Sequence, residues 1–355
     1  MDKFKIDSHK LNYHPRRLAD WMDGKNIYPL YMELSPIGSC NHRCTFCGLD
    51  FMGYKPVRLE TERMRTLLPE LGRLGVKSIM YAGEGEPFLH KDMAEIAEMT
   101  KAAGIDAAFT TNGVLLKPRT AERVLRSASW IKISCNGGDA ESHSRIHRCP
   151  EGDFDKIFSN LRYAVDYKRK NALSCAIGVQ LVLLPENIHT VVSLAQLCAE
   201  IGVDYLVVKP FSQHTQSLNR QYHDLHYSAL DDVIAGATAC ARDDFQVIFR
   251  LDTIRKWNEG EKPYPKCLAL PFWSYIDSHG NVWGCSMFLG HDEFLYGNIN
   301  ENSFEEIWNS EKRKKSLRYV AEKLNIGECR INCRMDAANR YLTDLIHPPE
   351  HVNFI

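Results

Sequence analysis

The sequence has no long apolar run, no apolar leader and almost no net charge. No stretch approaches the roughly 18 apolar residues of a membrane-spanning helix, and residues 1–5 do not begin a signal segment. The formal net charge of the 355 residues is −1, so bulk charge indicates neither nucleic acid nor an anionic membrane as a partner. These absences predict a cytoplasmic protein whose twelve cysteines are reduced thiols or metal ligands rather than disulfides.

Three of the cysteines lie on one short segment with the spacing C-x3-C-x2-C: Cys40, Cys44 and Cys47. Three thiolates on one loop can each bind one iron of a [4Fe–4S] cube. The fourth iron is then left without a protein ligand, and an open iron can bind and reduce a small molecule. A zinc site usually offers paired C-x2-C knuckles instead. The segment therefore favours a cluster that performs radical chemistry.

A second candidate ligand set follows the pattern C-x12-G-x4-C and, after a gap, C-x3-C. Its cysteines are Cys267, Cys285, Cys329 and Cys333. Four thiolates can saturate a [4Fe–4S] cluster, and a structural zinc site with four cysteine ligands is the alternative. The wide separation of Cys267 and Cys285 favours iron–sulfur. The other five cysteines are expected by default to be small buried apolar residues.

Short apolar runs alternate with helical stretches from residue 31 to about 230. Strands are expected over 31–34, 77–82, 105–111, 131–134, 177–184 and 205–209, and helices over 61–74, 92–103, 154–170 and 188–201, with a further helix opening at Pro118. Six units in this order predict an α/β fold with a parallel sheet and its helices outside. Such sheets place their chemistry at the carboxyl ends of the strands.

The second expected strand ends in the turn Gly83-Glu84-Gly85-Glu86-Pro87. Glycines let the backbone approach a ligand closely, and a carboxylate beside them can hold an ammonium group. A tight turn with an exposed glutamate explains the same residues equally well, because a glycine-rich turn alone is a weak signal.

Together these features resemble the radical S-adenosylmethionine (SAM) superfamily, over roughly residues 28–340. The cysteine loop, with Phe46 before its third cysteine, matches the pattern C-x3-C-x-Φ-C, and Gly85-Glu86-Pro87 matches the end of the Gly-Gly-Glu-Pro motif. The first position of that motif is Glu84 here. The resemblance implies that the turn at Gly83, Gly85 and Glu86 holds the SAM amino group and that the backbone around Phe46 contacts adenine. It further implies that four residues at or after strand ends contact the cofactor: Asn112, Ser134, Asn136 and Arg148.

The C-terminal module resembles the twitch form of the SPASM/twitch extension, which has one auxiliary cluster. The full SPASM form has a C-x2-C pair shortly before its final cysteines, and residues 320–323 contain none. The pattern is most similar to 2-deoxy-scyllo-inosamine dehydrogenase-like twitch enzymes, which oxidise a secondary alcohol on a cyclic polyol. The expected architecture is an N-terminal extension (1–30), a partial (β/α)6 radical SAM barrel (31–230), a linking helix and strand (231–262), a twitch auxiliary-cluster domain (263–340) and a tail (341–355).

The resemblance implies a 5′-deoxyadenosyl radical, two [4Fe–4S] clusters and a flavodoxin or ferredoxin as electron donor. If the radical removes hydrogen from a carbinol carbon, a base can take the hydroxyl proton and the auxiliary cluster can accept the electron, which favours dehydrogenation. Epimerisation is the alternative, with Cys135 or Cys149 returning a hydrogen atom. Lys209, His214 and Arg250 follow or end later strands and are candidates for orienting a hydroxyl or taking its proton. Ion pairing at the barrel rim explains each of them equally well.

The substrate is expected to be a small polar molecule, such as a sugar, an aminocyclitol or a nucleotide sugar. Only about 30 residues precede the first expected strand, which leaves no room for an N-terminal peptide-recognition domain. Peptide or protein modification is the runner-up, and a non-catalytic iron–sulfur carrier is a third possibility that the SAM-type turn disfavours. No nucleic acid or membrane partner is expected, and the sequence gives no indication of oligomeric state.

Overall fold

The computed structural model describes residues 4–6, 8–260 and 262–354. Within these residues one ten-stranded sheet runs in the order β10-β9-β8-β1-β2-β3-β4-β5-β6-β7. Neighbouring strands from β8 through β7 are parallel, whereas β8, β9 and β10 pair antiparallel. The strands are β1 (Tyr31–Leu34), β2 (Ser78–Tyr81), β3 (Asp106–Thr111), β4 (Ala128–Ser134), β5 (Ala176–Leu183), β6 (Tyr205–Pro210), β7 (Gln246–Phe249), β8 (Trp273–Ile276), β9 (Asn281–Trp283) and β10 (Leu295–Asn298).

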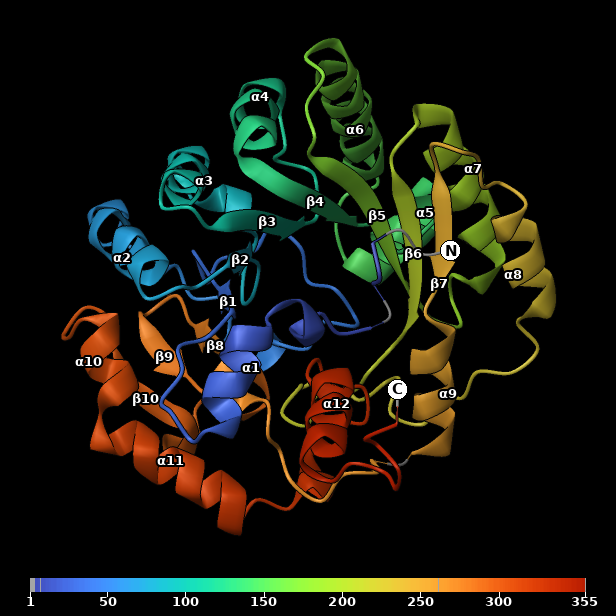
Figure 1. Ribbon diagram of the computed structural model, residues 1–355. Helices are drawn as coiled ribbons and strands as arrows, with labels where there is room; N and C mark the ends of the chain where they lie inside the picture. The colour runs from blue at the N-terminus through green and yellow to red at the C-terminus, as the bar shows by residue number, and fades with distance from the viewer. Residues whose placement is uncertain (1–3, 7, 261, 355) are drawn as a thin grey trace.

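Figure 1 shows the sheet curving around an interior, with a row of helices along its outer face. These helices are α2 (Thr61–Arg73), α3 (Met93–Ala102), α4 (Pro118–Ser127), α6 (Gly152–Lys170), α7 (Val191–Ile201) and α8 (Asp231–Thr238). The remaining α-helices of the described residues are α1 (Pro15–Met22), α5 (Ala140–His147), α9 (Leu251–Glu259), α10 (Phe304–Asn309), α11 (Glu311–Glu322) and α12 (Asp336–Ile346). None of the helices in the described ranges has the length and apolar character needed to cross a membrane.

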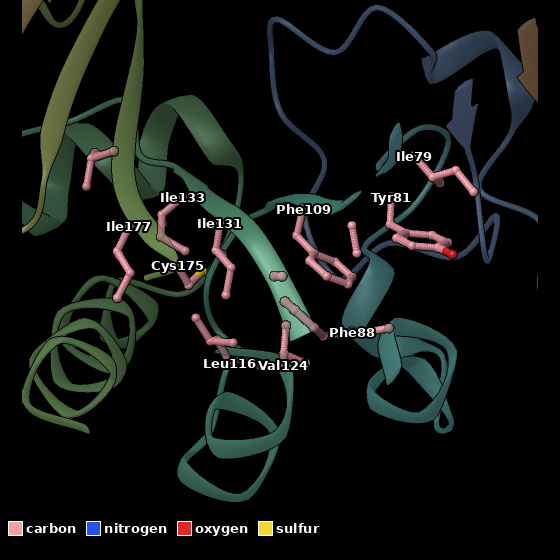
Figure 2. Close-up of a cluster of buried hydrophobic side chains, with 14 of the residues drawn as sticks. Ile79, Tyr81, Phe88, Phe109, Leu116, Val124, Ile131, Ile133, Cys175 and Ile177 are labelled. Carbon is pink, nitrogen blue, oxygen red and sulfur yellow. The ribbon is translucent and has the colours of Figure 1, made fainter. Parts of the chain in front are cut away.

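The hydrophobic core lies between the outer face of the sheet and these helices. Figure 2 shows side chains of β3 and β4, including Phe109, Ile131 and Ile133, directed toward Leu116 and Val124 at α4. Successive side chains of a strand point to opposite faces. The residues between these core positions therefore face the interior of the curved sheet, and several of them are polar or charged.

Near the amino ends of the later strands, the inner face of the sheet carries apolar side chains. Phe4 and Ile6 pack there against a small cluster that includes Tyr205, and the rings of Phe4 and Tyr205 are 5.1 Å apart. Gly178 makes room for this tyrosine, because a Cβ at residue 178 would lie 2.1 Å from the Tyr205 ring. Access to the interior from this end is thus narrowed by the N-terminal segment.

The expected α/β fold is confirmed, and all six expected barrel strands are present within a few residues of their predicted bounds. Two features go beyond the sequence prediction. The strand expected in the linking segment, β7, pairs with β6 in the same sheet, and β8 of the C-terminal module pairs with β1. Both pairings cover edges that would otherwise leave backbone groups unpaired. The predicted domain boundaries stay a prediction.

Candidate active site

The first cysteine loop follows β1 and is held by two neighbouring segments. The backbone N–H of Arg43 donates to the His147 carbonyl at 3.0 Å and that of Thr45 donates to the Ile146 carbonyl at 2.9 Å, both at the end of α5. On the other side the Glu86 N–H donates to the Ser39 carbonyl at 2.9 Å. The loop is therefore fixed between α5 and the glycine-rich turn before any cofactor binds.

The three cysteines of this loop are half-buried, and each thiol lies in surroundings that favour its neutral form. Burial raises the pKa of Cys40 to about 11, and it raises the pKa of Cys44 and Cys47 as well. Metal binding must therefore displace protons from these sulfurs. Three thiols from one short loop, of which Cys40 and Cys44 both sense the charge of Cys47, fit the donor set of a three-cysteine [4Fe–4S] cluster.

Two positions of the glycine-rich turn, Gly85 and Gly83, have no room for a side chain. A Cβ at residue 85 would lie 2.1 Å from the Ser39 carbonyl oxygen, so the turn and the cysteine loop are in direct contact. Gly83 has φ +114°, and a Cβ there would lie 2.5 Å from the Tyr275 hydroxyl. The turn is thus packed on the loop from one side and on β8 from the other.

The two glutamates of the turn have different roles. Glu86 is buried and accepts hydrogen bonds from the Thr111 hydroxyl at 2.5 Å, the Asn112 N–H at 2.8 Å and the Phe88 N–H at 3.2 Å. Burial raises its pKa, and these bonds act in the opposite direction. The Glu86 carboxylate thereby holds β3 against the turn, so a SAM amino group at this place would also rely on the turn's carbonyl groups.

Glu84, which stands where the family motif has glycine, bonds to the segment after β8. Its carboxylate accepts from the Ser278 hydroxyl at 2.7 Å and from the Ser278 N–H at 3.1 Å. Ser278 follows β8, at the start of the C-terminal module. The departure from the motif therefore places a buried tie between the barrel turn and that module.

Two of the four residues expected to contact the cofactor at or after strand ends, Asn112 and Asn136, form hydrogen bonds within the protein. The Asn112 side chain donates to the Asn41 side chain at 2.7 Å, which links β3 to the cysteine loop. Asn136 accepts from the Val182 N–H through its side-chain oxygen. Ser134 is half-buried at the end of β4, and Arg148 is exposed after α5 with φ +47°. Their contacts with SAM stay a prediction.

His147 gives the cysteine loop a neighbour that the sequence analysis missed. Its Nε2 atom lies 3.2 Å from the backbone N of Asn136, and a backbone N–H can only donate. Nε2 is therefore the acceptor, so the neutral ring carries its proton on Nδ1. Nδ1 lies 3.3 Å from the Cys44 sulfur and 3.3 Å from Nδ1 of His42. The single Nδ1–H of His147 is thus shared between the Cys44 sulfur and the His42 ring.

A short polar chain continues from His147 through His42 to Asp153. Because Nδ1 of His42 accepts, its Nε2–H donates to the Asp153 carboxylate at 3.2 Å. Asp153 also pairs with Lys156 at 2.8 Å. This chain was not predicted from the sequence because α5 was not predicted. The available signal was His42 inside the cysteine motif together with His143 and His147, which are four residues apart.

The second cysteine set encloses an apolar cavity in the C-terminal module. All four cysteines line it, together with mostly apolar side chains that include Leu270, Trp273, Met287, Phe288, Phe294 and Met335. Burial raises the pKa of Cys267 to about 12 and that of Cys329 to about 11. Apart from the cysteines, Lys262 and Tyr264 are among the few polar side chains of the lining, and the Lys262 ammonium bonds to the carbonyls of Ile326 and Cys329. Four thiols around a dry cavity fit a saturated [4Fe–4S] cluster.

The candidate catalytic residues do not all face one place. Lys209 lies on the inner side of β6, and Arg250 follows β7. Both ring nitrogens of His214 are engaged, since Nδ1 accepts from the Gln216 N–H at 3.2 Å and Nε2 lies 3.2 Å from the Ser286 carbonyl. Cys135 is fully buried in the main core, whereas Cys149 is half-buried near His42 and His143.

Several charged inner-face residues escaped the sequence analysis altogether. They are Glu33 on β1, Lys132 on β4, and Arg330 and Arg334 beside the last two cysteines. Arg334 pairs with Glu33 at 2.8 Å and donates to the Tyr31 hydroxyl at 2.6 Å. The alternation of β4, with Lys132 between two buried isoleucines, was the signal that could have found it.

Comparisons with known proteins agree with this site. A family model described as the radical SAM superfamily matches residues 34–198, and one described as an iron–sulfur cluster-binding SPASM domain matches residues 267–334. An AdoMet-dependent heme synthase of Methanosarcina barkeri is 25% identical over 298 residues, which is 79% of this chain and 82% of that protein. Mycofactocin maturase MftC of Mycolicibacterium smegmatis is 25% identical over 328 residues, or 89% of this chain and 78% of its own.

Solved structures show the same fold. The crystal structure of Streptococcus suis SuiB bound to S-adenosylmethionine has a TM-score of 0.63 at 18% identity, covering 84% of this chain and 70% of that one. The two matched domains imply SAM and two [4Fe–4S] clusters as cofactors. The cysteine sets described above supply a donor set for each cluster.

Proposed function

This chain belongs to the radical SAM superfamily and carries a C-terminal SPASM domain, and we propose that it oxidises a secondary alcohol of a small polar substrate. The substrate classes are a sugar, an aminocyclitol or a nucleotide sugar, and the electron donor is a low-potential flavodoxin or ferredoxin. When bound, SAM and its cluster supply a 5′-deoxyadenosyl radical that removes hydrogen from carbon, while the second cluster supplies an electron acceptor.

The observation that carries the proposal is the polar inner face of the sheet between the two cysteine sites. Lys209 on β6 senses the charges of Arg330 and Arg334, and these arginines directly follow two of the SPASM cysteines. Two strands of the same sheet, β1 and β2, lead into the cysteine loop and the glycine-rich turn. A substrate held there lies next to both cofactors, as a reaction that uses both requires.

Lys209 is the proposed base. Burial lowers the pKa of its ammonium well below the usual range, and the nearby cations add to the effect. A neutral amine inside the barrel can accept the proton of a substrate hydroxyl. The oxidation then balances, because the carbinol carbon loses a hydrogen atom to the radical, the hydroxyl loses a proton to Lys209, and one electron leaves as the C=O bond forms.

Peptide modification is the second candidate, because relatives favour it. One relative is named a mycofactocin maturase, and a structure of SuiB is titled as bound to a precursor peptide. Epimerisation is a third outcome. For it, Cys149 is the better hydrogen donor, since Cys135 lies in the core on the outer side of the sheet.

The proposal is tested with anaerobically reconstituted enzyme, SAM and dithionite, by mass spectrometry of 5′-deoxyadenosine and of candidate sugars and nucleotide sugars. We expect deuterium from the carbinol carbon to appear in 5′-deoxyadenosine, with one ketone formed per SAM cleaved. The Lys209→Met variant should retain SAM cleavage and lose most of the ketone. An isomeric alcohol in place of a ketone would indicate epimerisation, and a modified peptide would indicate the second candidate.

A further inference from the structure

Five cationic side chains gather on the inner face of the sheet: Lys132, Lys209, Arg250, Arg330 and Arg334. Lys209 senses the other four, and Lys132 senses Arg334 and Arg250. They come from β4, β6, the end of β7 and the segment around the last two cysteines. Distant parts of the chain therefore direct positive charge into one interior region.

The carboxylate of Glu33 compensates only part of this charge. Glu33 is the acid that Lys132, Arg330 and Arg334 share, and Arg334 already pairs with it at 2.8 Å. Lys132 and Lys209 have no ion pair among the described residues, and Arg330 has a buried Nε atom without a hydrogen-bond partner. Negative charge on Cys333 or Cys285 would offset part of the Arg330 charge. Both lysines stay uncompensated.

These side chains are half-buried and lie outside the main hydrophobic core. Lys132, Lys209 and Arg330 all keep accessible surface, and burial lowers the pKa of Lys132 to about 8. The Arg334 side chain is 34% accessible in spite of its buried position. Buried cations without counter-ions cost folding free energy, so a site that keeps them is built to receive a negative charge.

We propose that Lys132 and Arg330, with Arg250 and Arg334 beside them, bind an anionic oxygen group of the substrate, a phosphoryl or carboxylate group. This inference rests on the proposed function and narrows its substrate class. A nucleotide sugar or sugar phosphate fits the site, whereas an aminocyclitol would bring an ammonium group into a cationic region. Lys209 keeps its role as base, because burial is the largest cause of its lowered pKa and persists when the anion binds.

An apolar strip on the same inner face suits the rest of such a substrate. Met80, Ala82 and Ala108 form it, with Tyr31 and Trp130 packed against them. The Lys132 ammonium lies 5.2 Å from the centre of the Trp130 ring. A charged end at the cations and a ring face on the strip would orient the substrate within the barrel.

The test is calorimetric titration of the reconstituted enzyme, saturated with SAM, with pyrophosphate, phosphate, malonate and neutral glucose at constant ionic strength. We expect one pyrophosphate site, at least tenfold weaker binding in Lys132→Met and Arg330→Met, and near-normal binding in Lys132→Arg. Lys117→Met removes an equal but exposed charge and should bind as the wild type does. Iron content and anaerobic thermal unfolding report whether each variant is intact, and SAM affinity is measured separately.

Each outcome decides the proposal. Preference for pyrophosphate assigns a phosphoryl group and preference for malonate assigns a carboxylate, and both support an anion site. Absence of anion binding, equal binding in Lys132→Met, or loss of SAM affinity in that variant would overturn it. The last result would mean that the cations hold the SAM carboxylate. These readouts need no turnover, so an enzyme that binds anions but forms no ketone would contradict the proposed function alone.

Discussion

The two cysteine sites of this chain differ in their surroundings more than in their sulfurs. The first has three thiols on one loop, polar neighbours and a His147 N–H that is shared between Cys44 and His42. The second has four thiols from three segments around an apolar cavity. An incomplete ligand set in polar surroundings leaves an iron open for a polar cofactor, whereas a complete set in a dry cavity suits electron storage.

The comparison also shows how the two sites are joined. The barrel turn beside the first site is tied to the C-terminal module through Glu84 and Ser278, and β8 continues the barrel sheet from β1. Lys209 on the charged inner face senses Arg330 and Arg334, which follow two cysteines of the second site. The fold therefore connects the two sites, although their cysteines are more than two hundred residues apart in the sequence.

Replacing Cys40, Cys44 and Cys47 together by alanine should have the largest effect. Iron content is expected to fall from about eight to about four atoms per chain, and formation of 5′-deoxyadenosine should stop. Iron and sulfide analysis after anaerobic reconstitution measures the first and chromatography the second. A wild type with about four irons, and none in the variant, would mean that the second set holds zinc or nothing and would break the comparison.

Replacing Cys267 and Cys285 by alanine should separate the functions of the two sites. We expect the variant to keep about four irons and to form 5′-deoxyadenosine, because the first loop is held by α5 and the glycine-rich turn. Ketone formation should fall at least a hundredfold, since no acceptor remains for the electron. Unchanged ketone yield would show that the second cluster takes no part in the oxidation.

Replacing Glu84 by alanine tests the tie between the sites. It leaves the buried N–H and hydroxyl of Ser278 without an acceptor, which should cost about 1–3 kcal/mol of stability. Anaerobic thermal unfolding measures the loss. Glu62→Ala is the matched control, because the Glu62 side chain is 85% exposed in a surface pair with Arg65 and should change the Tm little. Equal shifts for both variants would argue against the tie.

Replacing His147 by phenylalanine should have the smallest effect and the most specific one. Loss of the N–H donor toward Cys44 is expected to lower the reduction potential of the first cluster by about 50 mV, since one such bond contributes about 1 kcal/mol. A redox titration followed by electron paramagnetic resonance resolves both clusters. The potential of the second cluster, which has no contact with His147, serves as internal control, and a shift of both would refute the assignment.

The fold and both cysteine sets were predicted from local patterns in the sequence. Short apolar runs between helical stretches predicted β1 to β6, because the outer face of each strand is buried whatever side chains line the interior. Cysteine spacing predicted the ligands, because three thiols on one loop are neighbours in any fold. Glu86 was also found from its motif, although its bonds to Thr111, Asn112 and Phe88 were not foreseen.

The missed residues depend on contacts between distant segments. His147 lies on α5, a helix of eight residues whose histidine-rich sequence gave no apolar period. Lys132 and Arg330 indicate an anion site only when they are considered together, because a single lysine or arginine in a sequence is usually an exposed surface charge. His214 was a candidate base in the sequence, but in the structure its two ring nitrogens contact the Gln216 N–H and the Ser286 carbonyl.

The sequence by itself determined the chemistry that this protein can support, since cysteine spacing and the glycine-rich turn are local and set the cofactors. Only the tertiary structure decided where that chemistry acts. Strand pairing brought Lys132, Lys209 and the arginines of the C-terminal module to one interior face. Electrostatic interactions depend on distance in space rather than on separation in the sequence. The anionic group proposed for the substrate could therefore be inferred only from the folded sheet, in which these cations lie together.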